Sequence, residues 1–256
     1  MSRWYVYCLG DEVTAEMVEG ARGLDGAPLS LVGRGDISAV VSAFAEERVP
    51  VTPENALTHN RVNAALLARS TPLPFRFGTL VAEARLLDFI ESHEAALREA
   101  LARVRGAVEM SVKIIWDLEA VKREAVGPEP EASKAEGEEA AEGATATSEA
   151  TSEAGGSGTA FLLAKRREIL SGEALREKAE ALAGWFGGRL SDLAREARVV
   201  VNPKGALVVR AAHLVGRGQV EEFRARVHQL GEERAGSLRF LTSGPWPPYS
   251  FGDVRP

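Results

Sequence analysis

The chain has 256 residues, of which 45% are apolar and 27% are charged, and its formal net charge is −6. This length allows one or two globular domains, each with its own core. The segment 126–158 holds eight Glu against one Lys and carries −7, which leaves the rest of the chain near neutral at +1. A neutral body argues against a nucleic-acid-binding protein. Without an apolar run of membrane-spanning length, a secretory signal or a second cysteine beside Cys8, the sequence predicts a cytoplasmic protein with no membrane contact.

The acidic segment 126–158 consists almost wholly of Ala, Glu, Gly, Ser, Thr and Pro, with no aromatic residue and no Leu or Ile. Such a composition cannot bury enough apolar surface to offset the entropy lost on ordering. The segment therefore predicts a disordered linker between an N-terminal domain, 1–125, and a C-terminal domain, 159–256.

The first domain opens with strand-like alternation over 3–9, where Cys8 is expected as a small buried residue. A short polar helix is predicted near 12–21, and a hairpin over 29–32 and 37–44. Thr52 and Pro53 give a good helix start, with a capping hydroxyl followed by proline at the first helical position.

Two stronger patterns follow in the first domain. Apolar residues at helical spacing predict one helix over 86–104, which Gly106 ends. Strict alternation then predicts a strand over 108–117, with the even-numbered positions from Val108 to Trp116 on one face. These elements predict helices packed on one face of a sheet.

The second domain begins with a long helical stretch whose apolar stripe runs from Leu175 to Ala197. A hairpin over 198–201 and 206–215, a helix over 219–234 and a strand over 238–242 follow. Helix, strand, strand, helix, strand is the ferredoxin-like order without its first strand. The predicted fold class is α+β: two tandem domains with ferredoxin-like elements, joined by the disordered acidic linker.

The four histidines offer little for catalysis. His93 and His228 lie on predicted helices among charged residues and are expected in solvent, whereas His213 is either a core-edge imidazole or a lone functional group. His59 shares a helix face with Asn63, which favours a helix-end or interface contact over catalysis. No nucleophile elbow, metal-ligand spacing or phosphate loop is present, so we expect neither an enzyme nor a cofactor or metal.

The stretch 71–79 places Arg76 between Phe75 and Phe77, with prolines before it and a glycine after it. In a strand the two phenylalanines would share one face and Arg76 would point to the other, where it would need carboxylates or carbonyls if covered. The alternative is a structural bulge with a paired arginine.

The C-terminal stretch 243–251 combines three prolines with Trp246, Tyr249 and Phe251. The prolines exclude a helix or a central strand, and the aromatic rings offer large apolar area at low entropic cost. Such a tail either folds back into the protein's own core or presents aromatic anchors to a partner.

These stretches resemble the motifs of the gas vesicle protein F/L family (GvpL/GvpF). The matches are the Pro-x-Arg-Phe-Gly-Thr signature at 74–79, the C-terminal Gly-Pro-Trp-Pro-Pro-Tyr-x-Phe at 244–251, a Glu-x-x-x-Lys strand at 109–113 and the opening Tyr-Val-Tyr at 5–7. The candidate interaction residues are Tyr5, Tyr7, Pro74, Arg76, Phe77, Gly78, Thr79, Glu109, Lys113, Trp246, Pro247, Pro248, Tyr249 and Phe251. The linker is longer and more acidic than is typical of the family.

The resemblance implies a non-enzymatic accessory protein, located in the cytoplasm and at the gas vesicle, without a cofactor. Its expected partners are the major gas vesicle shell protein and other accessory proteins. Our hypothesis is that the folded body binds the apolar shell subunit before or during assembly and limits its self-association. The alternative is a small-molecule-binding regulatory module built from tandem ferredoxin-like domains. An enzyme would require His59, Arg76 and a carboxylate to meet in one pocket.

Overall fold

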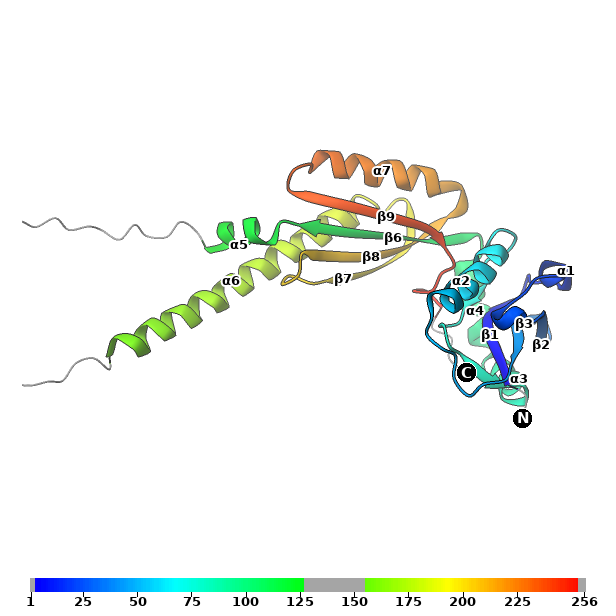
Figure 1. The fold of residues 1–256 in the computed structure, drawn as a ribbon. Helices are drawn as coiled ribbons and strands as arrows, with labels where there is room; N and C mark the ends of the chain where they lie inside the picture. Colours follow the sequence, from blue (N-terminus) through cyan, green and yellow to red (C-terminus); the bar gives the residue numbers. More distant parts are fainter. Residues whose placement is uncertain (1–2, 127–154, 253–256) are drawn as a thin grey trace, which may run out of the picture.

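A computed structural model describes residues 3–126 and 155–252, with side chains described over 3–122 and 172–252. Two antiparallel sheets form the molecule (Figure 1). The first is five-stranded, in the order β2-β3-β1-β4 with β5 also paired to β1, and the second is four-stranded, in the order β7-β8-β6-β9. The predicted α+β class, with helices packed on two sheets, is confirmed.

The first module comprises residues 3–106. Its strands are β1 (Arg3–Gly10), β2 (Leu29–Arg34), β3 (Ile37–Phe44), β4 (Leu73–Pro74) and β5 (Leu80–Ala82), and its α-helices are α1 (Ala15–Val18), α2 (Pro53–Leu67), α3 (Glu83–Ser92) and α4 (Glu94–Val104). β1 is its centre, and the residues from Tyr5 to Leu9 are fully buried, including Cys8 as predicted. Burial on both faces follows from the apolar character of both faces of this strand.

Local side-chain chemistry sets two helix ends in the first module. Thr52 Oγ1 accepts a hydrogen bond from Asn55 N at 3.2 Å, which confirms the predicted cap of α2. The single helix predicted over 86–104 is instead two helices that meet at His93. Ser92 Oγ bonds the Asp88 carbonyl and His93 Nδ1 lies 3.0 Å from the Phe89 carbonyl, and such local bonds compete with helical continuation.

The second module comprises residues 107–252. Its strands are β6 (Ala107–Trp116), β7 (Ala194–Val201), β8 (Leu207–Gly216) and β9 (Leu238–Trp246), and its helices are α5 (Leu118–Val126), α6 (Gly155–Gly188) and α7 (Val220–Glu233). Both α6 and α7 cover the same face of the sheet, since Phe186 of α6 and Phe223 of α7 both contact the ring of His213 on β8. The inward residues of β6 are the alternating apolar positions that the sequence identified.

The placement of β6 corrects the sequence analysis. The 108–117 strand was predicted as part of the first domain, but it lies between β8 and β9 in the second sheet. Gly106, at φ 68°, turns the chain away from α4 at this point. β1 already has β3 on one side and β4 and β5 on the other, so the first sheet offers β6 no place beside its central strand.

Three further boundaries differ from prediction. The predicted linker 126–158 lies outside the described residues except at its ends, where α5 ends at Val126 and α6 begins at Gly155. Ala197, expected on the helical stripe, lies in β7, because α6 ends at the Gly187-Gly188 pair. β9 continues to Trp246 as an edge strand, where a proline without an N–H is tolerated.

Within the described ranges, none of the helices combines the length and apolarity that a bilayer crossing requires.

Candidate interaction site at the junction of the two modules

The family-like motifs come together where the two modules meet. β1 and the 74–79 turn belong to the first module, Glu109 lies at the start of β6, and β9 leads into the C-terminal tail, which we define as residues 247–252. Figure 1 shows β9 and β6 entering this junction from the second sheet. Motifs far apart in sequence are therefore parts of one structural feature.

The 74–79 stretch is a turn after the short strand β4. Gly78 has φ 88°, and the Thr79 hydroxyl donates to the Arg76 carbonyl at 2.7 Å. Phe75 and Phe77 do not share a face, contrary to the prediction for a strand, because the chain leaves the sheet after Pro74. Phe75 is buried in the core of the first sheet, whereas Phe77 packs at 6.3 Å from the Tyr5 ring. Arg76 is exposed, so it needs no covering partner.

A buried polar network joins β1, α2 and the tail. Tyr5 Oη lies 2.7 Å from His59 Nδ1, and the Asn63 amide nitrogen lies 3.1 Å from His59 Nε2. The same amide donates to Tyr249 Oη at 3.0 Å, and Tyr249 Oη donates to Asn60 Oδ1 at 3.2 Å. His59 thus makes an interface contact, as its position on the helix predicted.

Burial keeps this network neutral. Desolvation lowers the pKa of His59 to about 4 and raises the pKa of Tyr249 to about 12. It also raises the pKa of Tyr5 above its ordinary value. A neutral imidazole with one donor and one acceptor nitrogen can satisfy both Tyr5 and Asn63. The network therefore fixes the tail to α2, and neither His59 nor Tyr249 gains or loses a proton near neutral pH.

Glu109 holds the tail from the side of the second module. The backbone N–H of Ser250 donates to one of its carboxylate oxygens at 2.7 Å, and the Ser250 hydroxyl donates to the other at 2.9 Å. Burial raises the pKa of Glu109, while the bonds from Ser250 oppose that shift. Both carboxylate oxygens are therefore engaged in holding the tail.

Phe251 completes the attachment of the tail to the first module. Its side chain is fully buried in the core formed with Leu73 and Phe75, and its carbonyl accepts from Arg103 at 2.5 Å. Of the two alternatives for the tail, the structure bears out the folded-back one for Pro247, Pro248 and Phe251, which are buried. Trp246, in contrast, is 44% exposed.

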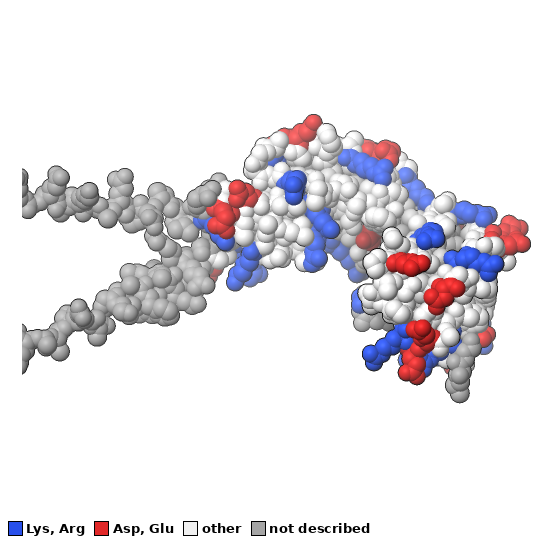
Figure 2. Space-filling model, viewed as in Figure 1, with Lys and Arg blue, Asp and Glu red and all other residues white. Residues whose placement is uncertain are grey.

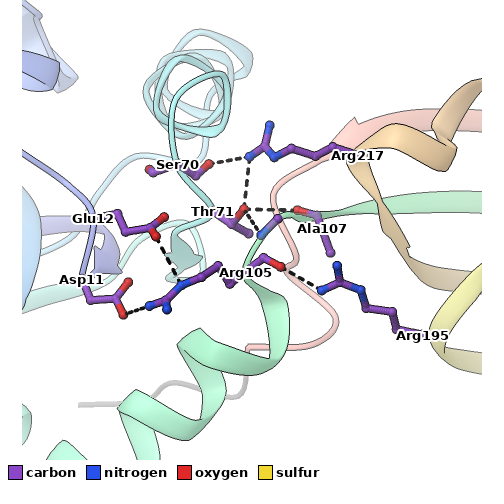
Figure 3. Close-up of polar contacts among 9 residues, drawn as sticks. Asp11, Glu12, Ser70, Thr71, Arg105, Ala107, Arg195 and Arg217 are labelled. Atoms are coloured by element: carbon purple, nitrogen blue, oxygen red, sulfur yellow. Dashed lines mark hydrogen bonds and ion pairs between the residues drawn. The ribbon is translucent and has the colours of Figure 1, made fainter.

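A second set of contacts, which the sequence analysis missed, locks the chain where β6 leaves α4 (Figure 3). Arg217 donates to the Ser70 carbonyl at 2.6 Å and to Thr71 Oγ1 at 3.1 Å. Thr71 Oγ1 also accepts from Gly106 N at 3.2 Å and donates to the Ala107 carbonyl at 3.4 Å. The sequence around Arg217 gave no signal for these contacts, because their acceptors lie about 146 residues away along the chain.

Arg105 and Arg195 extend these contacts (Figure 3). Arg105 pairs with Asp11 and, at 3.3 Å, with Glu12, while Arg195 donates to the Arg105 carbonyl at 2.8 Å. The Arg105 side chain is about half exposed, so its ion pairs contribute modestly to stability. These ion pairs lie within the first module, whereas the bond from Arg195 on β7 joins the second module to the first.

A cavity of about 460 Å³ opens beside the tail, on the face of the second sheet that α6 and α7 leave uncovered. Arg76, Glu109 and Lys113 from the motifs line it, together with Tyr249 and Ser250. His59 is not among its lining residues, so this cavity does not bring His59 together with Arg76 and Glu109. Within the described part of the chain, no group of three or more His, Cys, Asp or Glu side chains could hold a metal ion.

Comparison with known proteins identifies relatives over nearly the whole chain. A gas vesicle protein L from Streptomyces sp. (strain CB03234) is 29% identical, covering 98% of this chain and 92% of that protein, and gas vesicle protein L1 from Halobacterium salinarum is 24% identical, covering 96% and 89%. The crystal structure of GvpF from Anabaena sp. PCC 7120 shares the fold, with a TM-score of 0.77 at 20% identity over 100% of this chain and 98% of that one. The model of the family "Gas vesicle synthesis protein GvpL/GvpF" matches residues 3–253. The chain therefore belongs to the GvpL/GvpF family of gas vesicle synthesis proteins.

Proposed function

We propose that the protein is a non-enzymatic accessory factor of gas vesicle assembly that binds the major shell protein and other accessory proteins. Its place of action is the cytoplasm and the growing vesicle. Support comes from the family and from relatives named gas vesicle protein L and F that align over nearly the whole chain. The proposal needs no nucleic acid, lipid surface or cofactor.

The observation that carries the proposal is the use of the family-like motif residues. Glu109, Tyr249 and Phe251 are occupied in joining the modules, and Tyr5 is buried within the first module, where it holds His59. An enzyme would leave such groups open to a substrate in a positioned constellation. Because these residues instead fix the two modules together, we infer a rigid body whose surface spans both modules. Such a surface suits binding to another macromolecule.

Exposed apolar side chains give this body somewhere to contact an apolar shell subunit. Val51 is 88% exposed and Leu57, on the first half of α2, is 63% exposed. Trp246 lies at the end of β9, on the other side of the junction. Exposed apolar and aromatic groups of this kind are the anchors of protein interfaces. Binding there would limit self-association of the shell subunit.

We also assign the second module to the ferredoxin-like type. Its elements follow the order β6-α6-β7-β8-α7-β9, and the strand order β7-β8-β6-β9 with both helices on one face supports the assignment. β6 would be the first strand that residues 159–256 lack. The domain boundary then falls near Gly106, so we propose modules of 3–106 and 107–252 in place of 1–125 and 159–256.

The alternative, a small-molecule regulatory module, has one observation in its favour. The 460 Å³ cavity lies within the size range of ligand pockets. Its lining is rich in charged groups, whereas such pockets are mostly apolar. Thermal shift against a panel of metabolites separates the two functions, because a large saturable stabilisation by a small molecule would favour the alternative.

The direct test is co-purification from cells that express the vesicle proteins together. Tagged full-length protein should retain the shell protein, and Leu57→Ser with Val51→Ser should reduce the amount retained. Arg85→Ser, at another exposed helical position, is the matched control. Deletion of the gene should impair vesicle formation. If the shell protein does not co-purify and deletion leaves vesicles unchanged, the proposal is wrong.

A further inference from the structure

The uncovered face of the second sheet carries a row of side chains that crosses all four strands. Lys113 on β6 lies directly opposite Arg210 on β8 and Leu241 on β9, and Arg210 lies opposite Val200 on β7. We call these four positions the cationic row. At its centre, two positive charges stand side by side on adjacent strands.

Like charges directly opposite on neighbouring strands destabilise a sheet. Within the described residues, neither Lys113 nor Arg210 forms an ion pair that would offset this repulsion. The sheet thus keeps an unfavourable arrangement that a single neutral or acidic residue would relieve. An anionic group bound across the two strands would convert the repulsion into attraction.

Two more arginines and the junction make this part of the face concave. Arg198, on β7 opposite Ala212, and Arg76, from the 74–79 turn, line the 460 Å³ cavity with Lys113 and Arg210. We call this cavity the cationic cleft. Its one lining carboxylate, Glu109, has both oxygens bonded by Ser250. Arg198 is also paired with Glu196 at 3.6 Å, but four cationic side chains against one carboxylate still give the lining an excess of positive charge. Figure 2 shows Lys and Arg side chains along the side of the molecule where Figure 1 places β7.

Apolar side chains flank the charges. Val200 is 54% exposed at one end of the cationic row and Leu241 is 46% exposed at the other. Four strands spaced about 4.8 Å apart give a width of roughly 14 Å, which suits one extended segment or one helix. The floor between the charges is small, with Ser111 opposite Ala212.

We propose that the cationic cleft and row bind an amphipathic, carboxylate-rich segment of a partner protein. This inference adds a binding surface to the proposed function. It rests on the proposed function only where it takes the partner to be another vesicle component. A nucleic acid fits less well, because the row presents aliphatic groups where single-strand binders on open sheets present stacking aromatic rings. Carboxylates would pair with Lys113 and Arg210, and apolar residues of the segment would cover Val200 and Leu241.

The test uses the full chain and a fluorescein-labelled peptide of repeated Glu-Ala-Glu-Leu units, with the Gln-for-Glu peptide as its control. Fluorescence anisotropy should show saturable binding of the Glu peptide that weakens as salt rises. Lys113→Ala with Arg210→Ala should weaken binding by about tenfold or more. Lys204→Ala with Arg85→Ala removes the same charges at exposed positions elsewhere and should leave it unchanged. The charge-reversed pair, Lys113→Glu with Arg210→Glu, should bind the corresponding Lys peptide instead.

Four results would overturn the proposal. Equal binding of the Gln peptide would remove the charge pairing, and tighter binding of an oligothymidylate of equal charge would favour phosphate. A large gain in peptide affinity when the Glu residues of 129–153 are changed to Gln would make the chain's own acidic segment the occupant. If the shell protein co-purifies but the peptide does not bind, only this inference fails. Peptide binding without co-purification of any vesicle protein would instead refute the proposed function.

Discussion

The two sheets differ in what covers them. The first sheet has a closed core, whereas the second sheet has a face that the helices α6 and α7 do not cover. The central strand of the first sheet, β1, is fully buried from Tyr5 to Leu9, and the tail closes that module with Phe251. Among the described residues, α6 and α7 cover one face of the second sheet, and the tail and the first module cover the other face only at its Glu109 end. The first module therefore has a closed core that contributes to stability. The second has a charged face, which we propose as the binding surface for a partner.

The first prediction tests where the modules divide, and its expected effect is the largest. Residues 159–256 alone should not fold, because β6 would be missing from between β8 and β9. Residues 107–256 should fold, since every strand of the second sheet is then present. Circular dichroism and cooperative urea unfolding of each fragment check this. A cooperatively folded 159–256 fragment would restore the division at the linker.

The second prediction breaks the closure of the first module. Phe251→Ala should lower the free energy of unfolding by about 3–5 kcal/mol, because it opens a cavity in a core where the ring is fully buried. Trp246→Ala, close by in sequence but 44% exposed, is the control and should have a much smaller effect. Urea unfolding of both variants measures the difference. Equal effects would mean that the tail is not part of the core.

The third prediction compares the two buried histidines, one in each module. Burial lowers the pKa of both His59 and His213 to about 4. Between pH 6.5 and 4 the two histidines become protonated in the unfolded chain but not in the folded chain. The free energy of unfolding should therefore decrease as the pH is lowered, by up to about 3 kcal/mol for each histidine. The raised pKa of Glu109 acts in the opposite sense and favours the folded state as pH falls. Chemical unfolding at several pH values gives the slope.

Leucine variants distinguish the two sites. His59→Leu should cost about 1–3 kcal/mol at pH 7, because Tyr5 and Asn63 lose a buried hydrogen-bond partner. Neither ring nitrogen of His213 makes a hydrogen bond of good geometry among the described residues, and the nearby Met110 backbone only partly offsets the effect of burial on its pKa. His213→Leu should therefore be neutral or stabilising at pH 7. Each variant should also remove its own share of the acid sensitivity. Equal losses at pH 7 would show that the two sites do not differ in hydrogen bonding.

Local patterns in the sequence predicted most elements but not which sheet each strand joins. Alternation located β6 and its inward face, and Thr52 with Pro53 located the start of α2. β6 pairs with β8, which lies about a hundred residues away along the chain, and no local pattern encodes that pairing. The composition of the linker suggested a boundary there, whereas the chain passes from the helices of the first sheet to a strand of the second sheet at Gly106, in the short loop between α4 and β6.

The sequence motifs named several residues that the structure places at the junction, but they did not give the arrangement of those residues. Glu109 and Lys113 were identified together, yet the structure gives them different roles, one holding the tail and the other in the cationic row. A net charge of +1 outside the linker concealed the local excess, because β-strand register, and not composition, brings Lys113 beside Arg210. Charge counted along a sequence says little about charge across a sheet.

The last prediction, with the smallest effect, tests whether the second sheet gives up stability for its charged face. Lys113→Thr should raise the free energy of unfolding by about 0.2–1 kcal/mol, because it removes a like-charge pair and introduces a β-branched residue. Arg210→Thr should do the same, and the double variant should gain less than the sum of both, since one substitution already relieves the repulsion. Lys113→Arg keeps the pair and should give no gain. With the Glu peptide in excess, binding to the unaltered protein should reverse the order of stabilities. If each single variant instead loses stability, and the loss in the double variant equals the sum of the two, the two cations do not repel each other. The main argument for a bound anion would then be lost.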